Sequence, residues 1–262
     1  MTPMRLVGPE GDGIEVRHAS PYPLDFAAHK RDRAAMSFPA IITSPLPATE
    51  PSLDCALCPR LVDARTACRA EFPNFWNAPV PAFGDPDAWL AIVGLAPGKH
   101  GANRTGRPFT GDPSGDMLFA TLAKAGFLSH DEVPEPKHLY GGFKNDGARL
   151  TGVIILNAVK CLPPENKPTP DELRNCRPHL KAALDALPRL TTILALGQVA
   201  HQSTVKACGE KLPKRRFAHG AVHKLLDGRT LIDSYHTSRY NQNTGRITED
   251  MFDEVFALAR SA

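Results

Sequence analysis

The chain has 262 residues, of which 42% are hydrophobic and 23% charged, which suits one globular domain with a decorated end or one large domain. It holds no apolar run of about eighteen residues and no basic-then-apolar signal pattern at its start, so we expect no membrane span and a cytoplasmic protein. The formal net charge is +3, which neither requires nor excludes a nucleic-acid partner.

Residues 1–50 differ from the rest of the chain. They are rich in Pro and Ala, as in SPYPLDF and SPLPATEPSL, and show little apolar periodicity. We interpret them as an irregular N-terminal extension or linker, parts of which can pack on the body. The remaining residues, 51–262, are predicted to form the folded domain.

From residue 51 onward, apolar strand-like runs alternate with helix-like segments. The expected strands are 89–95, 151–160, 191–197 and 229–236, and the expected helices are 114–127, 169–187, 198–208 and 248–262. Ser114 is a plausible cap of its helix, and Thr169 before Pro170 is a strong helix start. This alternation predicts an α/β fold with a parallel sheet covered on both faces, in which ligands bind beyond the carboxyl ends of the strands.

The first candidate site is the glycine-rich loop at 94–112, GLAPGKHGANRTGRPFTGD, directly after a predicted strand. Glycines such as Gly94 and Gly98 allow a backbone to approach a ligand closely, and free amides there can orient a water or an anion. A P-loop needs Ser or Thr after Gly-Lys, whereas His100 follows Lys99, and the G-x-G-x-x-G spacing is absent. The loop therefore predicts a ligand site of another kind.

Two side chains near the end of this loop carry candidate roles. The aromatic face of Phe109 lies among polar residues and could stack on a base, and Asp112 precedes the next helix. The alternative is a plain connection with Phe109 in the core and Asp112 as a helix cap. The loop is long for that task alone.

Asn157 stands near the end of the second predicted strand. A buried Asn needs partners for both its carbonyl and its amide. It can satisfy neighbouring backbone groups, or it can read a ligand that offers one donor and one acceptor, as uracil does. The sequence around Asn157 leaves both readings open.

His236 ends the last predicted strand. Its imidazole could donate to a developing anion, although a lone His is more often an ordinary structural residue. The polar loop TSRYNQNTGR after it carries Arg239 and Arg246 and suits a nucleic-acid groove. A basic run at 211–224 is either a solvated loop or a contact for the DNA backbone.

Four of the six cysteines form a candidate metal set, with C-x-x-C spacing in the first pair. The set is Cys55, Cys58, Cys161 and Cys176. Four thiolates can hold zinc or an iron–sulfur cluster, and spacing alone does not decide between them. The other two, Cys68 and Cys208, have no motif partner and are expected to be plain thiols.

Taken together, the stretches GLAPGKHGANRTGRPFTGD, NAVKCLPPENKPTP and SYHTSRYNQNTGR and the four cysteines resemble the uracil-DNA glycosylase superfamily. They look most like its family 5, also called type b. The related family 4 typically shows GEAPG and HP, where this chain has Leu95 and Thr237. The resemblance covers residues 52–262 and says nothing about the extension.

This resemblance implies a three-layer α/β/α sandwich around a central four-stranded parallel sheet. It implies a 4Fe–4S cluster on Cys55, Cys58, Cys161 and Cys176. It also implies a monofunctional DNA glycosylase, a hydrolase of N-glycosyl bonds, that flips uracil out of double-stranded DNA, excises it and so starts base excision repair. The substrate range of the branch can include hypoxanthine and other deaminated bases, and we expect a monomer.

The resemblance also implies roles for the candidate residues. Phe109 would stack on the extruded base, Asn157 would read the uracil edge and His236 would donate to the developing anion. Asp112 would orient or deprotonate the attacking water. Its role is the least determined of these, because other branches place a polar catalytic residue near Gly98.

The remaining implied contacts are with DNA. Gly94 and Gly98 would let the loop approach the substrate, and Arg239 with 241–245 would enter the minor groove beside the lesion. The basic residues 214–216 would contact phosphates.

Two alternatives remain open at this stage. One relative in the superfamily crosslinks to abasic DNA through a histidine in a basic loop, and His219 stands in such a stretch here. The other is an iron–sulfur protein that binds DNA without catalysis, which would leave Asn157 and His236 unexplained.

Overall fold

The structure is a computed structural model that describes residues 44–130, 147–212 and 215–262. Residues 1–43 lie outside this range, so of the predicted extension only 44–50 is described. Lys214, one of the basic residues expected to contact phosphates, also lies outside it.

Six strands form the main sheet in the order β1-β5-β2-β6-β8-β7. Their bounds are β1 (Phe83–Gly84), β2 (Leu90–Gly94), β5 (Val153–Asn157), β6 (Thr192–Leu196), β7 (Val222–Lys224) and β8 (Thr230–Ser234). The four inner strands β5, β2, β6 and β8 are mutually parallel, whereas β1 and β7 pair antiparallel at the two edges. The predicted four-stranded parallel sheet is confirmed as the centre of a larger mixed sheet.

The inner strands are readable from sequence because every residue in them is buried. A strand covered on both faces needs a continuous apolar run. The edge strands β1 and β7 have two and three residues, and neither is fully buried, so neither has such a run. They were not predicted for that reason.

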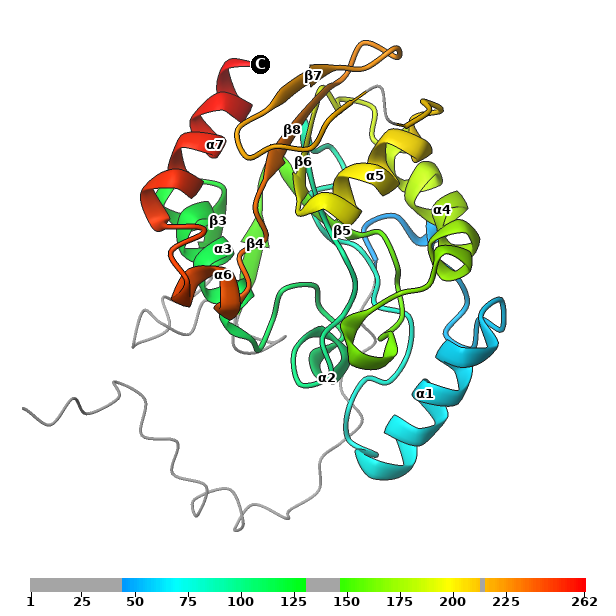
Figure 1. Cartoon of the computed structure of the whole chain (residues 1–262). Coiled ribbons are helices and arrows are strands. Elements are labelled where there is room, and N and C mark those ends of the chain that lie inside the picture. Colours follow the sequence, from blue (N-terminus) through cyan, green and yellow to red (C-terminus); the bar gives the residue numbers. More distant parts are fainter. Residues whose placement is uncertain (1–43, 131–146, 213–214) are drawn as a thin grey trace, which may run out of the picture. The chain divides into compact units, whose positions relative to one another are not determined.

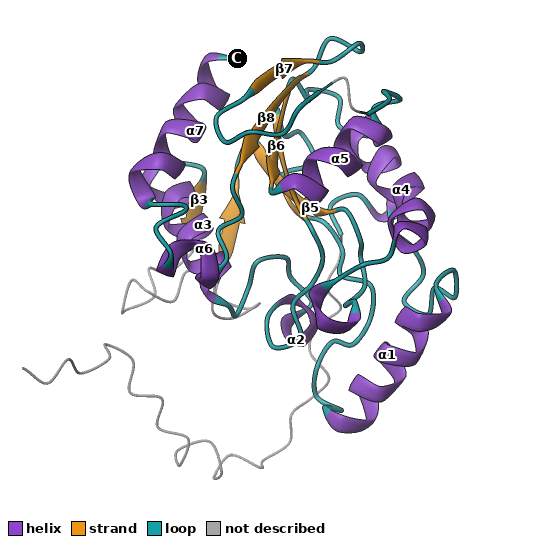
Figure 2. Ribbon diagram, viewed as in Figure 1, coloured by secondary structure: helices purple, strands orange, loops and turns teal. Residues whose placement is uncertain are grey.

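Helices cover both faces of the sheet, as Figure 2 shows, with α3 and α7 on one side and α4 and α5 on the other. This arrangement confirms the predicted three-layer α/β/α architecture. The helices are α1 (Pro59–Glu71), α2 (Ala102–Thr105), α3 (Pro113–Lys124), α4 (Pro170–Asp185), α5 (Gln198–Ala207), α6 (Arg239–Asn243) and α7 (Glu249–Ser261). Short 3-10 turns lie at Pro47–Thr49 and Pro164–Asn166, and β3 (Leu128–His130) pairs with β4 (Ala148–Leu150) (Figure 1).

The helix starts follow local capping chemistry. Thr169 and Glu172 form a full capping box at α4, as the sequence predicted. At α3 the predicted cap Ser114 is wrong, because Asp112 is the N-cap and accepts from the backbone amides of Ser114 and Gly115. Pro113 fills the first helical position, which places the cap one residue before it.

Residues 44–50 pack on the domain. Leu46 is buried in the core face shared with α4 and α5. The Glu50 carboxylate lies 2.8 Å from the Lys160 ammonium, and both side chains are largely buried. Its Oε1 also accepts from the backbone N–H of Ala82 at 2.8 Å. Within the described residues, no helix has the length and apolar character needed to cross a membrane.

Candidate functional site

The register of the parallel strands gathers the candidate loops at one edge of the sheet. Gly94, the last residue of β2, pairs with Asn157, the last residue of β5. Leu196 of β6 pairs in the same way with Ser234 of β8. The segments that follow these strands therefore leave the sheet side by side, as expected for a ligand site in this class of fold.

A cavity of about 720 Å³ opens at this edge. Its walls come from the turn into α5, from residues 215–218 and from the segment between β8 and the end of α6. His236, Asn241 and Arg246 line it, and Arg216 lies on its opposite wall segment. A space of this size with cationic and amide groups on its walls fits a polar ligand with anionic parts.

Phe109 and His236 lie against each other. Their rings are stacked, with centroids 5.9 Å apart and an interplanar angle of 28°. Phe109 is buried and has a φ of +53°, which is uncommon for an aromatic residue. Its carbonyl packs where a side chain on Gly115 would lie, since a Cβ there would be 1.8 Å from the Phe109 oxygen. The start of α3 thus fixes the direction of the aromatic ring.

Gly94 separates Phe109 from Asn157. A Cβ on Gly94 would lie 2.6 Å from Phe109 Cε2 and 2.7 Å from Asn157 Oδ1, so only glycine fits between them. Asn157 is buried, and among the described residues its side chain has no hydrogen-bond partner. A buried amide that is not used by the fold is available to a ligand. The structure therefore places Phe109 against His236 and, across Gly94, close to Asn157.

Asp112 uses its two carboxylate oxygens differently. Oδ1 accepts from the amides of Ser114 at 3.0 Å and Gly115 at 3.2 Å. Oδ2 faces the glycine loop, 3.5 Å from the position of a Cβ on Gly98 and 2.3 Å from that on Gly101. Within the described part of the chain no residue hydrogen-bonds to Oδ2. Asp112 is therefore a helix cap with one oxygen left for a ligand or water.

Burial lowers the pKa of His236 below its ordinary value, and the nearby Asp112 carboxylate opposes this shift. The neutral imidazole is therefore the favoured form at neutral pH. The backbone carbonyl of His236 accepts from Asn241 Nδ2 at 2.8 Å, which ties the residue to α6. The site thus holds a neutral N–H donor beside an aromatic ring.

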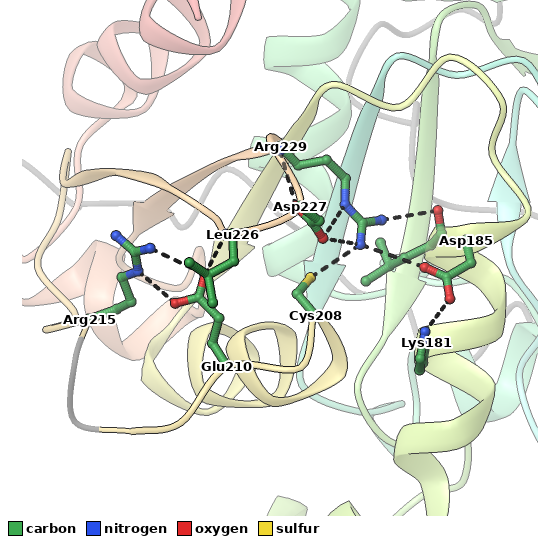
Figure 3. Close-up of polar contacts among 9 residues, drawn as sticks. Lys181, Asp185, Cys208, Glu210, Arg215, Leu226, Asp227 and Arg229 are labelled. Atoms are coloured by element: carbon green, nitrogen blue, oxygen red, sulfur yellow. Dashed lines mark hydrogen bonds and ion pairs between the residues drawn. The ribbon is translucent and has the colours of Figure 1, made fainter.

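The basic residues near the cavity differ in whether another side chain of the protein already binds them. Arg215, expected to contact phosphates, donates instead to both oxygens of Glu210, whose side chain is almost fully buried (Figure 3). Arg216 and Arg246 are exposed at the cavity, and Arg246 lies 4.6 Å over the Tyr235 ring. Arg239 is exposed as the first residue of α6 but does not line the cavity.

His219 is held by the fold. Its Nδ1 accepts from the backbone N–H of Tyr235 at 3.1 Å, and its ring stacks on that of Tyr235 at 5.0 Å. A ring nitrogen used in this way has no lone pair left for attack on a ligand. This geometry disfavours a crosslinking role for His219.

The four predicted metal-ligating cysteines line a second, small cavity between the start of α1, the segment after β5 and α4. Burial raises the pKa of Cys161 to about 12 and that of Cys176 to about 11, and it also raises the pKa of Cys58. These shifts apply to thiols without a bound cation. A metal bound there would supply the positive charge that stabilises the thiolates.

The surroundings of these cysteines fit an anionic metal–sulfur group. Cys176 Sγ accepts from the backbone N–H of Lys160 at 3.3 Å, and Cys58 Sγ from Asn175 Nδ2 at 3.6 Å. The buried Arg65 donates Nη2 to the Cys55 carbonyl, while its Nε and Nη1 are buried without a partner among the described residues. Unused donors of this kind suit thiolate or sulfide acceptors.

Cys208 lies apart from this set. It accepts from Arg229 Nη2 at 3.5 Å, and burial raises its pKa to about 11 (Figure 3). A buried thiol with a raised pKa is unreactive.

The sequence analysis missed one buried polar cluster beside the cavity, formed by His201, His223 and Asp233. The available signal was Asp233, a single carboxylate that directly follows the apolar pair Leu231 and Ile232 in a strand whose residues are all buried. A buried charge requires a partner, but the partners come from other elements.

The chain is similar to known proteins of one superfamily. The profile of the uracil DNA glycosylase superfamily matches residues 81–260. A type-5 uracil-DNA glycosylase of Thermus thermophilus is 46% identical over 213 residues, which cover 79% of this chain and 92% of that protein. One of Mycobacterium tuberculosis is 40% identical, covering 79% and 77%. A type-4 uracil-DNA glycosylase of Sulfurisphaera tokodaii is 29% identical, covering 71% and 77%.

Proposed function

The chain belongs to the uracil DNA glycosylase superfamily, in its type-5 branch, and on that premise we propose that it excises uracil from double-stranded DNA by hydrolysing the N-glycosidic bond. The observation that carries the proposal is that Phe109 packs against the His236 ring and lies, across Gly94, close to Asn157. We extend the proposed substrates to hypoxanthine and other deaminated bases. The product is an abasic site, with which base excision repair begins.

The base must first leave the duplex stack, which costs a few kcal/mol and least at a mismatch such as U·G. Phe109 offers a face on which the extruded ring stacks, a contact of about 1–3 kcal/mol. The unused amide of Asn157 pairs with one donor and one acceptor on the uracil edge. Cytosine presents the opposite pattern there and leaves the amide unpaired, which disfavours it.

Bond cleavage sends the electron pair of the C1′–N1 bond onto the base. The neutral His236 then donates an N–H hydrogen bond to the uracil oxygen on which negative charge collects. Burial lowers the pKa of His236, so the imidazole is already neutral at pH 7 and donates this hydrogen bond from its N–H group. His236 is in this proposal the main catalytic residue.

Water completes the hydrolysis by attacking the cationic C1′ carbon. Asp112 Oδ2 and the backbone beside Gly98 hold the water, and the proton passes from the water to the carboxylate. The negative carboxylate also offsets the positive charge of the sugar. Its other oxygen keeps the carboxylate in place as the cap of α3.

DNA contact falls to the exposed cations around the cavity. Arg216 and Arg246 are proposed to contact phosphates, and Arg239 on α6 is proposed to enter the groove beside the lesion.

The four cysteines are proposed to hold a 4Fe–4S cluster. The support is the convergence of four thiols, the N–H donors of Lys160 and Asn175 toward sulfur, and the unused donors of Arg65. When bound, such a cluster ties the segment before α1 to β5 and α4, and its role here is structural.

The proposed activity is tested with duplex oligonucleotides that carry uracil, hypoxanthine or xanthine, followed by alkaline cleavage at abasic sites. Strand breaks at uracil opposite guanine are expected, with breaks at hypoxanthine supporting the wider range. DNA binding without any breaks would instead support the non-catalytic alternative. A protein band shifted on a denaturing gel would support the crosslinking alternative.

Asp112→Asn is expected to lower single-turnover uracil excision by about 10- to 100-fold. Asparagine keeps an oxygen that can cap α3, so the fold should be retained while the charge is lost. The measurement is the excision rate with enzyme in excess, alongside the melting temperature. An unchanged rate would mean that the backbone amides of the loop position the attacking water without Asp112.

Stability is expected to fall as the pH is lowered below about 6.5, the ordinary pKa of histidine. Burial lowers the pKa of both His236 and His219 in the folded protein, so the unfolded chain binds protons first. Stability is therefore complete above about pH 6.5 and is lost progressively below it. Melting temperatures from pH 8 to pH 5 check this, and His236→Asn should flatten the dependence whereas the exposed His100→Asn should not.

A further inference from the structure

Three side chains from three elements form a hydrogen-bonded triad beside the cavity, of which His201 and Asp233 are buried and His223 is half-buried. Asp233 of β8 is fully buried, and His201 of α5 is 1% exposed. The carboxylate accepts at Oδ1 from His201 Nδ1 at 2.7 Å and at Oδ2 from His223 Nε2, on β7, at 3.1 Å. The second nitrogen of His201, Nε2, faces the backbone carbonyl of Arg215 at 3.1 Å.

One partner of His201 identifies a donor on its ring. A backbone carbonyl only accepts, so Nε2 carries a hydrogen and donates it to the Arg215 carbonyl. Nδ1 and the Asp233 carboxyl share one hydrogen across their 2.7 Å contact, and this bond holds the ring in place.

These distances suit a proton better than a metal ion. A metal that bound Nδ1 and Oδ1 at about 2.0–2.2 Å each would hold the two atoms about 3 Å or more apart. The observed 2.7 Å between His201 and Asp233 is that of a charge-assisted hydrogen bond.

The triad and the ion pair with Glu210 both hold Arg215, a residue of the cavity wall. The carbonyl of Arg215 is fixed by His201, and its guanidinium is fixed by Glu210, which also accepts from the Leu226 N–H at 2.8 Å (Figure 3). Phe217, two residues on, packs edge-on against the His201 ring at 5.8 Å. Between these two fixed points stands Arg216, which is exposed at the cavity.

We propose that His201 is a positioning residue that, held by Asp233, fixes the Arg215 carbonyl and thereby aims Arg216 at the DNA backbone. It touches neither the base nor the sugar. The inference rests on the proposed function for its DNA readout, whereas the hydrogen bond from His201 to Arg215 can be measured without DNA.

Two substitutions of His201 separate its two hydrogen bonds. The amide nitrogen of His201→Gln can reach the place of Nε2 and keep the donation to Arg215, while His201→Asn can reach the place of Nδ1 and keep the donation to Asp233. We expect His201→Asn to weaken binding of a uracil-containing duplex by about 10-fold, as for the loss of one phosphate contact. The slope of log affinity against log salt concentration should fall by about one. His201→Gln should bind within about 3-fold of the wild type.

Arg216→Gln is the matched control. Alone it should weaken binding as much as His201→Asn, and the double variant should be no weaker than either one, because both remove the same contact. Additive effects, or equal losses in the Gln and Asn variants, would overturn the positioning role.

The wild-type protein supplies a test that no folding defect can obscure. Nitrogen NMR of histidine-labelled protein should show one buried ring with a hydrogen on Nε2 that exchanges slowly with solvent, absent in His201→Gln. A His201 ring without a hydrogen on Nε2, or stoichiometric metal lost on its substitution, would overturn the assignment. If the wild type bound but did not excise uracil, the proposed function would fail while this result stood.

Discussion

His236→Ala is expected to slow single-turnover uracil excision by about 100- to 1,000-fold, the usual effect of removing one donor to a developing anion. The imidazole is the N–H donor stacked against Phe109, where the extruded base is proposed to lie. Its loss removes an interaction that exists only as the bond breaks, so DNA affinity should change little. Rates with enzyme in excess and affinities measured on a non-cleavable duplex separate the two quantities.

The matched control for this variant is His100→Ala. His100 stands in the same glycine-rich loop region but is exposed and packs on Phe72 and Phe75, away from the cavity walls. Its substitution should leave excision within about 3-fold of the wild type. If His236→Ala retained the full rate while folded, leaving-group stabilisation would have to come from another group, and the proposed mechanism would be lost.

The site was predictable where one element alone sets the position of a residue. Gly94 and Asn157 end buried parallel strands and His236 stands two residues after another. Such strands end at a common edge of the sheet, so the pairing of Gly94 with Asn157 and the place of His236 at that edge follow from the order of apolar runs. The same periodicity located the four inner strands. It did not locate α1, whose apolar residues form no continuous stripe, or the short edge strands β1 and β7.

What the sequence could not show is which polar groups the fold uses for itself. Arg215 stands in a basic run, which predicts a phosphate contact, yet its guanidinium forms an ion pair with Glu210. His201 and His223 are unremarkable along the chain, and only the packing of α5 and β7 on β8 brings them to Asp233. Pairings across elements depend on tertiary packing, which local patterns do not encode.

Cys161→Ser is expected to cost the protein its cluster and about 3–5 kcal/mol of stability. Without the anionic metal–sulfur group, the buried Arg65 guanidinium is left near thiols that burial keeps neutral, and a buried charge without a partner carries a cost of that size. For a domain of this length the loss corresponds to a fall in melting temperature of about 6–20 °C.

Cys208→Ser is the control for the same chemical change. Cys208 is also a largely buried thiol with a raised pKa, but it contacts Arg229 and lies outside the set, so its loss should cost about 1 kcal/mol and leave the metal content intact. Iron and sulfide per chain, visible absorption and melting temperature are measured on protein purified without oxygen. Because the proposed cluster would join the segment before α1 to the segment after β5 and to α4, its loss should unfold that region first, with hydrogen exchange rising at α1 before the central sheet. Wild-type protein that carried zinc instead of iron would refute the cluster, and a metal-free protein of unchanged stability would refute the structural role of the four cysteines.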